Sequence, residues 1–122
     1  MTHAELSQNA KMLASIADPL RIRILRLVLE RELCVCEVME VIKEPQYKIS
    51  RHLAVLKKAG LLRAWREGTW VHYEINSNLP SEWRKVLYDM RGIWDKSHTI
   101  QKDIQCLRHF SKRQPGVPVM CR

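Results

Sequence analysis

Residues 46–60 carry the clearest helical pattern in the chain. Apolar residues recur there at intervals of three and four and so lie on one face of a helix: Ile49, Leu53 and Leu56, widened by Ala54 and Val55. Pro45 ends any helix that enters from upstream. Gly60 follows the last periodic residue, where a helix favours a residue that tolerates a positive φ. The pattern predicts one short amphipathic helix.

The polar face of this helix is cationic or hydrogen-bonding and holds no acid: Tyr47, Lys48, Ser50, Arg51, His52, Lys57 and Lys58. Such a face suits a polyanion. An ordinary solvated helix surface is the alternative, and the surrounding elements decide between the two.

Three helices are predicted upstream. Residues 4–17 are loosely amphipathic, and Asp18 and Pro19 then form an N-cap and a first helical residue. Residues 20–29 bury Leu20, Ile24, Leu27 and Val28 and expose Arg21, Arg23 and Arg26. Residues 35–42 form a third short helix, and the next three residues turn the chain into the helix at 46–60. Two short helices joined by a turn, the second one basic, are typical of a helix-turn-helix.

A hairpin is predicted after the basic helix. Residues 62–66 and 70–75 read as strands, and residues 67–69 as a tight turn. A hairpin in this position makes a winged helix. Arg66 and Thr69 lie near its tip.

The pattern resumes at 81–110 as one long helix, which Gly92 weakens or bends. Its apolar stripe is longer than a small domain needs. We therefore expect it to form a homodimer interface together with the first helix, the alternative being that it covers the back of its own domain. The predicted fold is mainly α, a winged helix-turn-helix in the order α-α-α-α-β-β-α. Residues 1–110 form the DNA-binding and dimerisation domain and residues 111–122 a flexible tail.

Composition supports a nucleic-acid partner. The 122 residues include 21 Lys and Arg and 13 Asp and Glu, which gives a net charge of +8. No apolar run approaches the roughly 18 residues needed to span a bilayer, and the N-terminus does not resemble a secretory signal. We therefore expect a cytoplasmic protein whose four cysteines are reduced, which favours metal binding or redox sensing over structural disulfides.

Two stretches carry a resemblance to a known family. LASIADPLRIRILRLVLERELCVCEV and ISRHLAVLKKAGLLRAWREGTWVHYEI resemble the ArsR/SmtB metalloregulatory repressors, and the likeness covers about residues 8–90. It implies a homodimeric winged-helix repressor that occupies its operator without metal and leaves it when a toxic metal or metalloid binds. The ELCVC segment is similar to that of the arsenite and antimonite sensors.

This resemblance makes Cys34 and Cys36 the expected ligands of As(III) or Sb(III), soft ions that prefer thiolates. Residues two apart in a continuous helix do not face each other. We therefore predict that binding distorts the start of the third helix and displaces the next one. The alternative is that both cysteines are small buried apolar residues.

The third ligand is left open by the sequence. Family members often carry a cysteine where this chain has Met39. Cys106 is favoured over Cys121, a hydroxide or a small thiol, because a helical position is better ordered. Zinc is disfavoured because the family's D-x-H pattern is absent around Asp95, His98, Asp103 and His109, which are interpreted as surface residues. Cadmium and lead are disfavoured because a cysteine-rich N-terminal extension is missing.

The resemblance places six residues of the basic helix where the family's recognition helix meets the major groove, and two more residues lie on the wing: Gln46, Tyr47, Lys48, Ser50, Arg51, His52, Arg66 and Thr69. Gln46 suits adenine, and the cations suit phosphates or guanine. For His52 a packing role is equally expected. A symmetric dimer predicts an inverted-repeat operator with half-sites about one helical turn, or a multiple, apart.

Two other functions share this fold. One is a thiol-redox or persulfide-responsive repressor, for instance through Cys36 and Cys106. The other is an effector-independent DNA-binding protein. An enzyme is not expected, because no glycine-rich phosphate loop, H-E-x-x-H motif or nucleophile beside a base is present.

Overall fold

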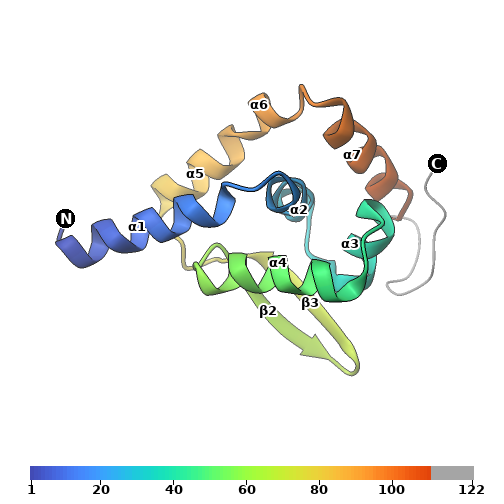
Figure 1. The fold of residues 1–122 in the computed structure, drawn as a ribbon, viewed down its shortest axis with the longest axis horizontal. Helices are drawn as coiled ribbons and strands as arrows, with labels where there is room; N and C mark the ends of the chain where they lie inside the picture. The colour runs from blue at the N-terminus through green and yellow to red at the C-terminus, as the bar shows by residue number, and fades with distance from the viewer. Residues whose placement is uncertain (111–122) are drawn as a thin grey trace.

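The computed structural model describes residues 1–110. It consists of helices around a small sheet (Figure 1). The elements are α1 (His3–Ile16), α2 (Pro19–Glu30), β1 (Leu33–Cys34), α3 (Val35–Ile42), α4 (Gln46–Lys58), β2 (Leu62–Glu67), β3 (Trp70–Ile75), α5 (Ser81–Asp89), α6 (Arg91–Trp94) and α7 (His98–Phe110). The predicted tail lies outside the described residues. Among residues 1–110, no helix combines the length and apolar character needed to cross a bilayer.

Local signals set the boundaries of α2 and α4 as predicted. The Asp18 carboxylate accepts hydrogen bonds from the backbone N–H groups of Leu20 and Arg21, both at 3.0 Å, and Pro19 is the first residue of α2. After α4, Gly60 adopts φ 91°, a left-handed conformation that other residues rarely tolerate. The chain therefore turns sharply from α4 into β2.

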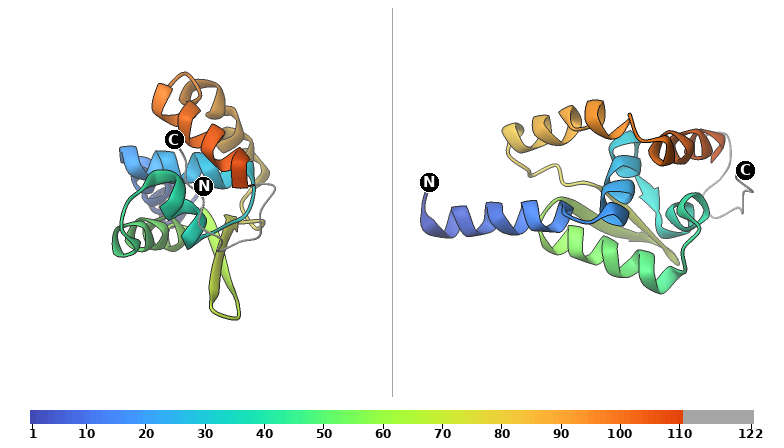
Figure 2. Two further views of the ribbon diagram at one scale, coloured as in Figure 1. Left: turned by 90° about the vertical axis from the view of Figure 1, so that its right-hand side faces the viewer. Right: turned by 45° about the horizontal axis from the view of Figure 1, so that its top comes forward.

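The helix-turn-helix is α3 and α4, joined by a short turn in which Lys43 has φ 61°. Beneath α4 the hairpin β2–β3 projects from the body as the wing (Figures 1 and 2). The predicted wing is confirmed, with Gly68 at φ 61° in its turn. A third strand was not predicted: β1 pairs antiparallel with β3, so that Cys34 lies opposite His72.

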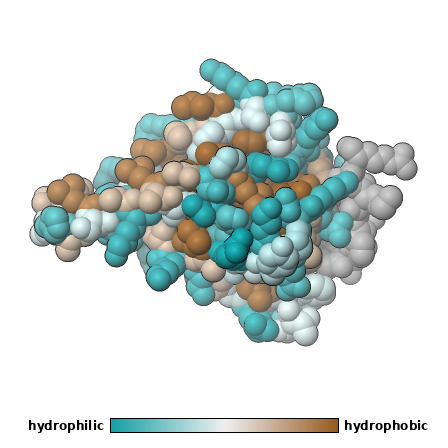
Figure 3. All heavy atoms as spheres, viewed as in Figure 1, coloured by the Kyte–Doolittle hydropathy of each residue, from teal (hydrophilic) through white to brown (hydrophobic). Residues whose placement is uncertain are grey.

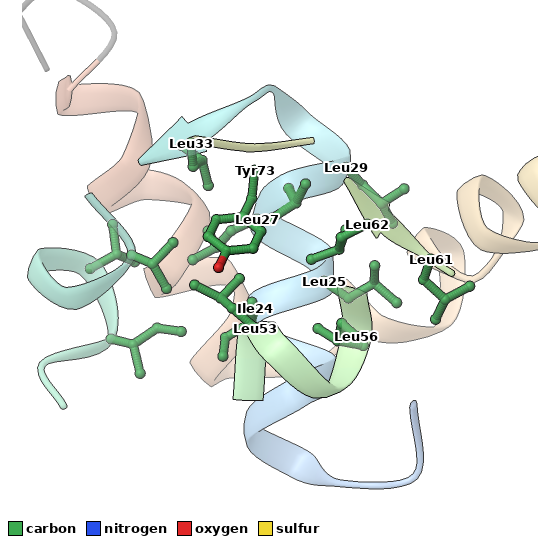
Figure 4. Close-up of a cluster of buried hydrophobic side chains, with 14 of the residues drawn as sticks. Ile24, Leu25, Leu27, Leu29, Leu33, Leu53, Leu56, Leu61, Leu62 and Tyr73 are labelled. Carbon is green, nitrogen blue, oxygen red and sulfur yellow. The ribbon is translucent and has the colours of Figure 1, made fainter. Parts of the chain in front are cut away.

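The core lies between α2, α4 and the sheet, as Figure 4 shows. The fully buried apolar side chains include Ile24, Leu25 and Leu27 of α2, Ile49, Leu53 and Leu56 of α4, and Leu33 and Leu62 of the strands. The predicted inward face of α4 is thus confirmed at its three periodic residues. Ala54, which we expected to widen this face, is exposed.

The single long C-terminal helix predicted for residues 81–110 is wrong. The chain breaks twice, after Asp89 and after Trp94, into α5, α6 and α7. At the second break, Ser97 accepts a hydrogen bond from the Ile100 N–H and so begins α7. Figure 2 shows α5 and α6 running along one side of the molecule, whereas α7 folds against α2 and α3.

Two ion pairs hold this folded-back segment. Arg26 was expected to be exposed but is only 3% exposed, and it contacts Asp95 at 2.6 Å and Glu30 at 2.7 Å. Arg23 forms two hydrogen bonds to Asp103, at 2.8 and 2.9 Å. Asp103 is 5% exposed, so its interpretation as a surface residue is also wrong. The two arginines fasten α2 to the C-terminal part of the fold.

Candidate effector site and nucleic-acid interface

The sulfur atoms of Cys34 and Cys36 lie together and are joined as a disulfide. Cys34 precedes α3 in an extended conformation, with φ −83° and ψ 160°, and Cys36 lies in the first helical turn. A continuous helix through both cysteines, the premise of the predicted distortion, is therefore not present. The two sulfurs converge while α3 keeps its helical geometry.

Hydrogen bonds fix the backbone at this pair. The Glu37 carboxylate accepts from the Cys34 backbone N–H at 3.0 Å and forms an ion pair with Arg31 at 2.8 Å. Glu37 is 5% exposed, so the carboxylate is sequestered with its partners. The N-terminal end of a helix carries partial positive charge, which favours the thiolate form of a reduced cysteine beside it.

A cavity of about 340 Å³ opens beside the pair. Its walls come from three elements: Cys34, Cys36 and Met39 at α3, Gln46 and Ser50 of α4, and Thr69, Trp70, Val71 and Tyr73 at the wing. The thiol pair, the basic helix and the wing therefore meet at one hollow. Burial raises the pKa of the Tyr73 phenol, which remains neutral at physiological pH.

Cys106 lies on α7, 8% exposed, and does not line this cavity. It is itself disulfide-bonded. Because Cys36 is bonded to Cys34, the Cys36–Cys106 pair considered for a redox-responsive repressor is not observed. Cys121, the other cysteine considered as a third ligand, lies outside the described residues. Met39 occupies the cavity wall in place of the family's additional cysteine.

Most of the predicted DNA-contacting side chains face solvent. Gln46, Tyr47 and Arg51 of α4 are exposed, as are Arg66 and Thr69 of the wing. Ser50 is half-buried at the cavity. Lys48 is half-buried and forms an ion pair with Glu44 at 3.3 Å. Apart from that carboxylate, the exposed side of α4 keeps the basic character expected for phosphate contacts.

His52 differs from the rest of this group because it faces α2. The Arg21 guanidinium donates to His52 Nδ1 at 3.3 Å, which requires an unprotonated nitrogen there. Burial lowers the pKa of His52 and favours the same neutral state. His52 thus anchors α4 to the start of α2, in agreement with the packing alternative.

The wing is braced by contacts between its strands. Arg63 pairs with Glu74, and the Trp65 and His72 rings stack with centroids 5.4 Å apart. Arg63 and His72 thus stabilise the pairing of the two strands. Arg66 and Thr69 are exposed and can contact DNA.

No cluster of three His, Cys, Asp or Glu side chains that could hold a metal ion occurs within residues 1–110. Asp95 and Asp103, two of the acids considered for zinc, form ion pairs with Arg26 and Arg23. Sequence reasoning missed the cavity lining of Trp70, Val71 and Tyr73, since only folding brings the wing to α3. The Glu37 cap was detectable, because an acid three residues after an N-cap is a known signature.

Comparison with known proteins identifies the family. Residues 18–64 match the model for "Bacterial regulatory protein, arsR family". The arsenic resistance transcriptional regulator ArsR1 of Pseudomonas putida is 37% identical over 108 residues, covering 87% of this chain and 81% of the relative. An uncharacterised HTH-type transcriptional regulator of Methanocaldococcus jannaschii is 39% identical over 82 residues, covering 66% of this chain and 92% of the relative.

A solved structure agrees with the fold. The homodimeric winged helix-turn-helix DNA-binding domain Mb0332 from Mycobacterium bovis superposes with a TM-score of 0.66 and 26% identity, covering 78% of this chain and 85% of that one. The prediction of a non-enzymatic regulator is confirmed. The chain therefore belongs to the arsR family and is a DNA-binding transcriptional repressor with a winged helix-turn-helix fold.

Proposed function

We propose that this repressor binds an inverted-repeat operator as a homodimer and releases it when As(III) or Sb(III) binds the thiolates of Cys34 and Cys36. One observation carries the proposal: the two sulfurs converge in a cavity whose other walls are the basic helix α4 and the wing. The P. putida relative, named an arsenic resistance regulator, supports arsenic as the effector.

The chemistry of the pair fits soft ions. Trivalent arsenic and antimony prefer thiolates over nitrogen and oxygen ligands. The effector-binding form is the reduced dithiol, which we place in the cytoplasm of the cell that carries the operator. Cys106, Cys121, a hydroxide or a small thiol remains the proposed third ligand, and Cys106 would have to be reduced first.

Release follows from the shared cavity. An atom bound between the two sulfurs occupies the hollow that Gln46 and Ser50 line from α4 and Thr69 from the wing. The ion therefore acts on both DNA-contacting elements at once, without unwinding α3. A ligand shifts such an equilibrium by its differential affinity for the DNA-competent and DNA-incompetent states.

The dimer is proposed to form through α1, α5 and α6. Large apolar side chains are exposed on these helices: Leu6, Leu13, Val86 and Ile93, each at least 50% exposed. Figure 3 shows apolar surface along α1 and over the α5–α6 edge. By contrast Ile100, Ile104 and Leu107 of α7 are buried in the protomer, so this part of the expected interface covers the protein's own core.

The test is release of operator DNA, selected from random sequence, measured by fluorescence anisotropy as arsenite, antimonite, cadmium or zinc is added to the reduced protein. We expect arsenite and antimonite to release operator DNA from the wild-type protein. The Cys34→Ser and Cys36→Ser variants should bind the operator normally but keep it when arsenite or antimonite is added. The Cys106→Ser variant tests Cys106 as the third ligand, because it should resist release only if Cys106 binds the ion. Unchanged release in both Cys34→Ser and Cys36→Ser would refute the proposal.

A second candidate is a redox-responsive repressor, favoured by the Cys34–Cys36 disulfide. Hydrogen peroxide would accept two electrons and two protons from the dithiol; the two S–H bonds and the O–O bond break, and the S–S bond and two molecules of water form. Operator release by peroxide, with a mass loss of two hydrogens and no response to arsenite, would favour this function over metalloid sensing.

A further inference from the structure

We propose that Glu44 limits the sequence-independent binding of DNA by holding Lys48 away from phosphates, and that it thereby raises the ratio of operator affinity to non-operator affinity. The proposal rests on the operator binding of the proposed function and does not depend on the metalloid response.

Glu44 places an acid beside an otherwise basic helix. It lies in the turn after α3, directly before Pro45, which is the N-cap of α4. The helix itself, Gln46–Lys58, contains no Asp or Glu. The Glu44 carboxylate pairs with Lys48 in the first turns of α4, with Oε1 and Nζ 3.3 Å apart. One of the cations expected to contact DNA is therefore already bound to an acid of its own chain.

The pair lies on the side of α4 that faces α2. Glu44 and Lys48 line a hollow of about 330 Å³ together with Arg23 and His52. Arg23 is fixed by its two hydrogen bonds to the buried Asp103, and the Glu44 charge attracts its guanidinium. Glu44 thus lies between a cation of α2 and a cation of α4. The Lys48 and Glu44 side chains are only 36% and 33% exposed, so solvent covers neither of them fully.

This arrangement opposes contact with a phosphate. Binding to DNA of any sequence depends on the number of phosphates that Lys and Arg neutralise. Lys48 must give up its carboxylate before it can contact a phosphate, and the carboxylate itself repels the DNA backbone. A partly exposed ion pair changes an equilibrium by a factor of about five at most. Removal of the Glu44 charge should therefore add one phosphate contact and a gain in affinity of that size.

The gain should be smaller on the operator than on other DNA. Base contacts hold α4 in one register on the operator, so Lys48 reaches only the phosphate that this register offers. A complex without base contacts can shift along the duplex until its free cations meet phosphates. Glu44 therefore penalises non-operator DNA more than it penalises the operator.

The experiment compares the full-length wild type with Glu44→Gln, which removes the charge and keeps the size of the side chain. Fluorescence anisotropy gives the affinity for the selected operator and for a random duplex of equal length, between about 50 and 200 mM salt. We expect Glu44→Gln to bind the random duplex about fivefold more tightly, with a log–log salt slope steeper by up to about 1, and to gain less on the operator. Loss of an acid at the start of α4 weakens the helix, so damage to the fold would not produce a gain.

Two further variants assign the effect to Lys48. In the Glu44→Gln background, Lys48→Ala should abolish the gain, whereas Lys48→Ala alone should change the affinity for the random duplex little. Glu32→Gln makes the same change in net charge at an exposed position between α2 and β1, and it should leave both affinities unchanged.

The outcomes separate this proposal from the proposed function. An unchanged affinity for the random duplex, an equal gain on both DNAs, an equal gain in Glu32→Gln, or a gain that survives Lys48→Ala would overturn it. A loss confined to the operator would also overturn it and would make Glu44 a base-contacting residue. A wild-type protein that prefers no DNA sequence would instead refute the operator binding of the proposed function.

Discussion

Single residues explain several boundaries of the fold, and those that act locally could be predicted from the sequence. Asp18 and Gly60 act through their own backbone neighbours, so their roles follow from residue type and position alone. Arg26 could not be assigned in this way. Its partner Asp95 is 69 residues away in the chain and is brought close only by the tertiary fold.

Asp18 gives a prediction at this scale. The Arg21 backbone N–H, together with the nearby positive charges, holds the pKa of Asp18 below its usual value. A carboxylate with a lowered pKa stabilises the fold above its unfolded pKa, about 3.9, and this contribution disappears as pH falls through the folded pKa. Asp18→Ala should lower the free energy of unfolding at pH 7 by about 1 kcal/mol, and Asp18→Asn by less, because Asn also caps helices.

Urea denaturation from pH 7 to pH 3 checks this prediction. The difference between the wild type and Asp18→Ala should shrink at the acidic end. A difference that stays constant over this range would show that the charge of the carboxylate contributes nothing.

Elements are connected by contacts that periodicity does not reveal. The pattern correctly predicted α3, α4 and the wing, each a short segment with its own turn signals. It failed for residues 81–110, because a stripe of apolar residues looks the same whether one helix or several carry it. After the second break, Asp95 and Asp103 pair with arginines of α2, and these tertiary contacts cannot be read from periodicity.

The link between α2 and α7 can be tested by removing one partner. Asp103 is buried and pairs with Arg23. Asp103→Ala should therefore lower the free energy of unfolding by about 2 kcal/mol, since it leaves a partly buried guanidinium without its acceptor. The matched control is Asp89→Ala, which removes the exposed pair with Lys85 and should cost well under about 1 kcal/mol. Equal costs for the two variants would contradict a structural role for the α2–α7 link.

The basic helix gives a second prediction for elements. Arg51 is exposed on α4, where a phosphate is the expected partner. Arg51→Ala should weaken operator binding and reduce the slope of log affinity against log salt by about 1. Lys102→Ala, which removes an exposed cation from α7, serves as the control and should leave both quantities unchanged. If Arg51→Ala kept full affinity for the operator, Arg51 would not contribute to DNA binding.

At the scale of the whole molecule, the protomer leaves an apolar face on α1, α5 and α6 while α7 covers its own core. The sequence allowed the apolar stripe of residues 81–110 either to form a homodimer interface or to cover the domain's own core. In the fold, α5 and α6 keep exposed apolar residues, whereas α7 covers the core. What the sequence could not reveal is the cavity, because its walls come from segments that are far apart along the chain and meet only in the folded protein.

The exposed face gives the prediction for assembly. Ile93 is 63% exposed, and Ile93→Asp places a charge in the proposed interface. Analytical ultracentrifugation should show a dimer for the wild type and a monomer for this variant. Tyr47→Asp, a charge on another exposed position, should remain dimeric. A wild-type protein that stays monomeric at high concentration would refute this assembly.

We propose that the Cys34–Cys36 pair and the DNA-contacting surface are energetically coupled through the cavity that both of them line. Such coupling is reciprocal, so the factor by which arsenite weakens operator binding must equal the factor by which the operator weakens arsenite binding. The most direct measurement is therefore the arsenite dissociation constant of the reduced protein, determined with and without saturating operator. We predict weaker arsenite binding on the operator, by the same factor found in the release experiment. An arsenite affinity that is identical in both states would contradict the coupling of these two cysteines to DNA binding.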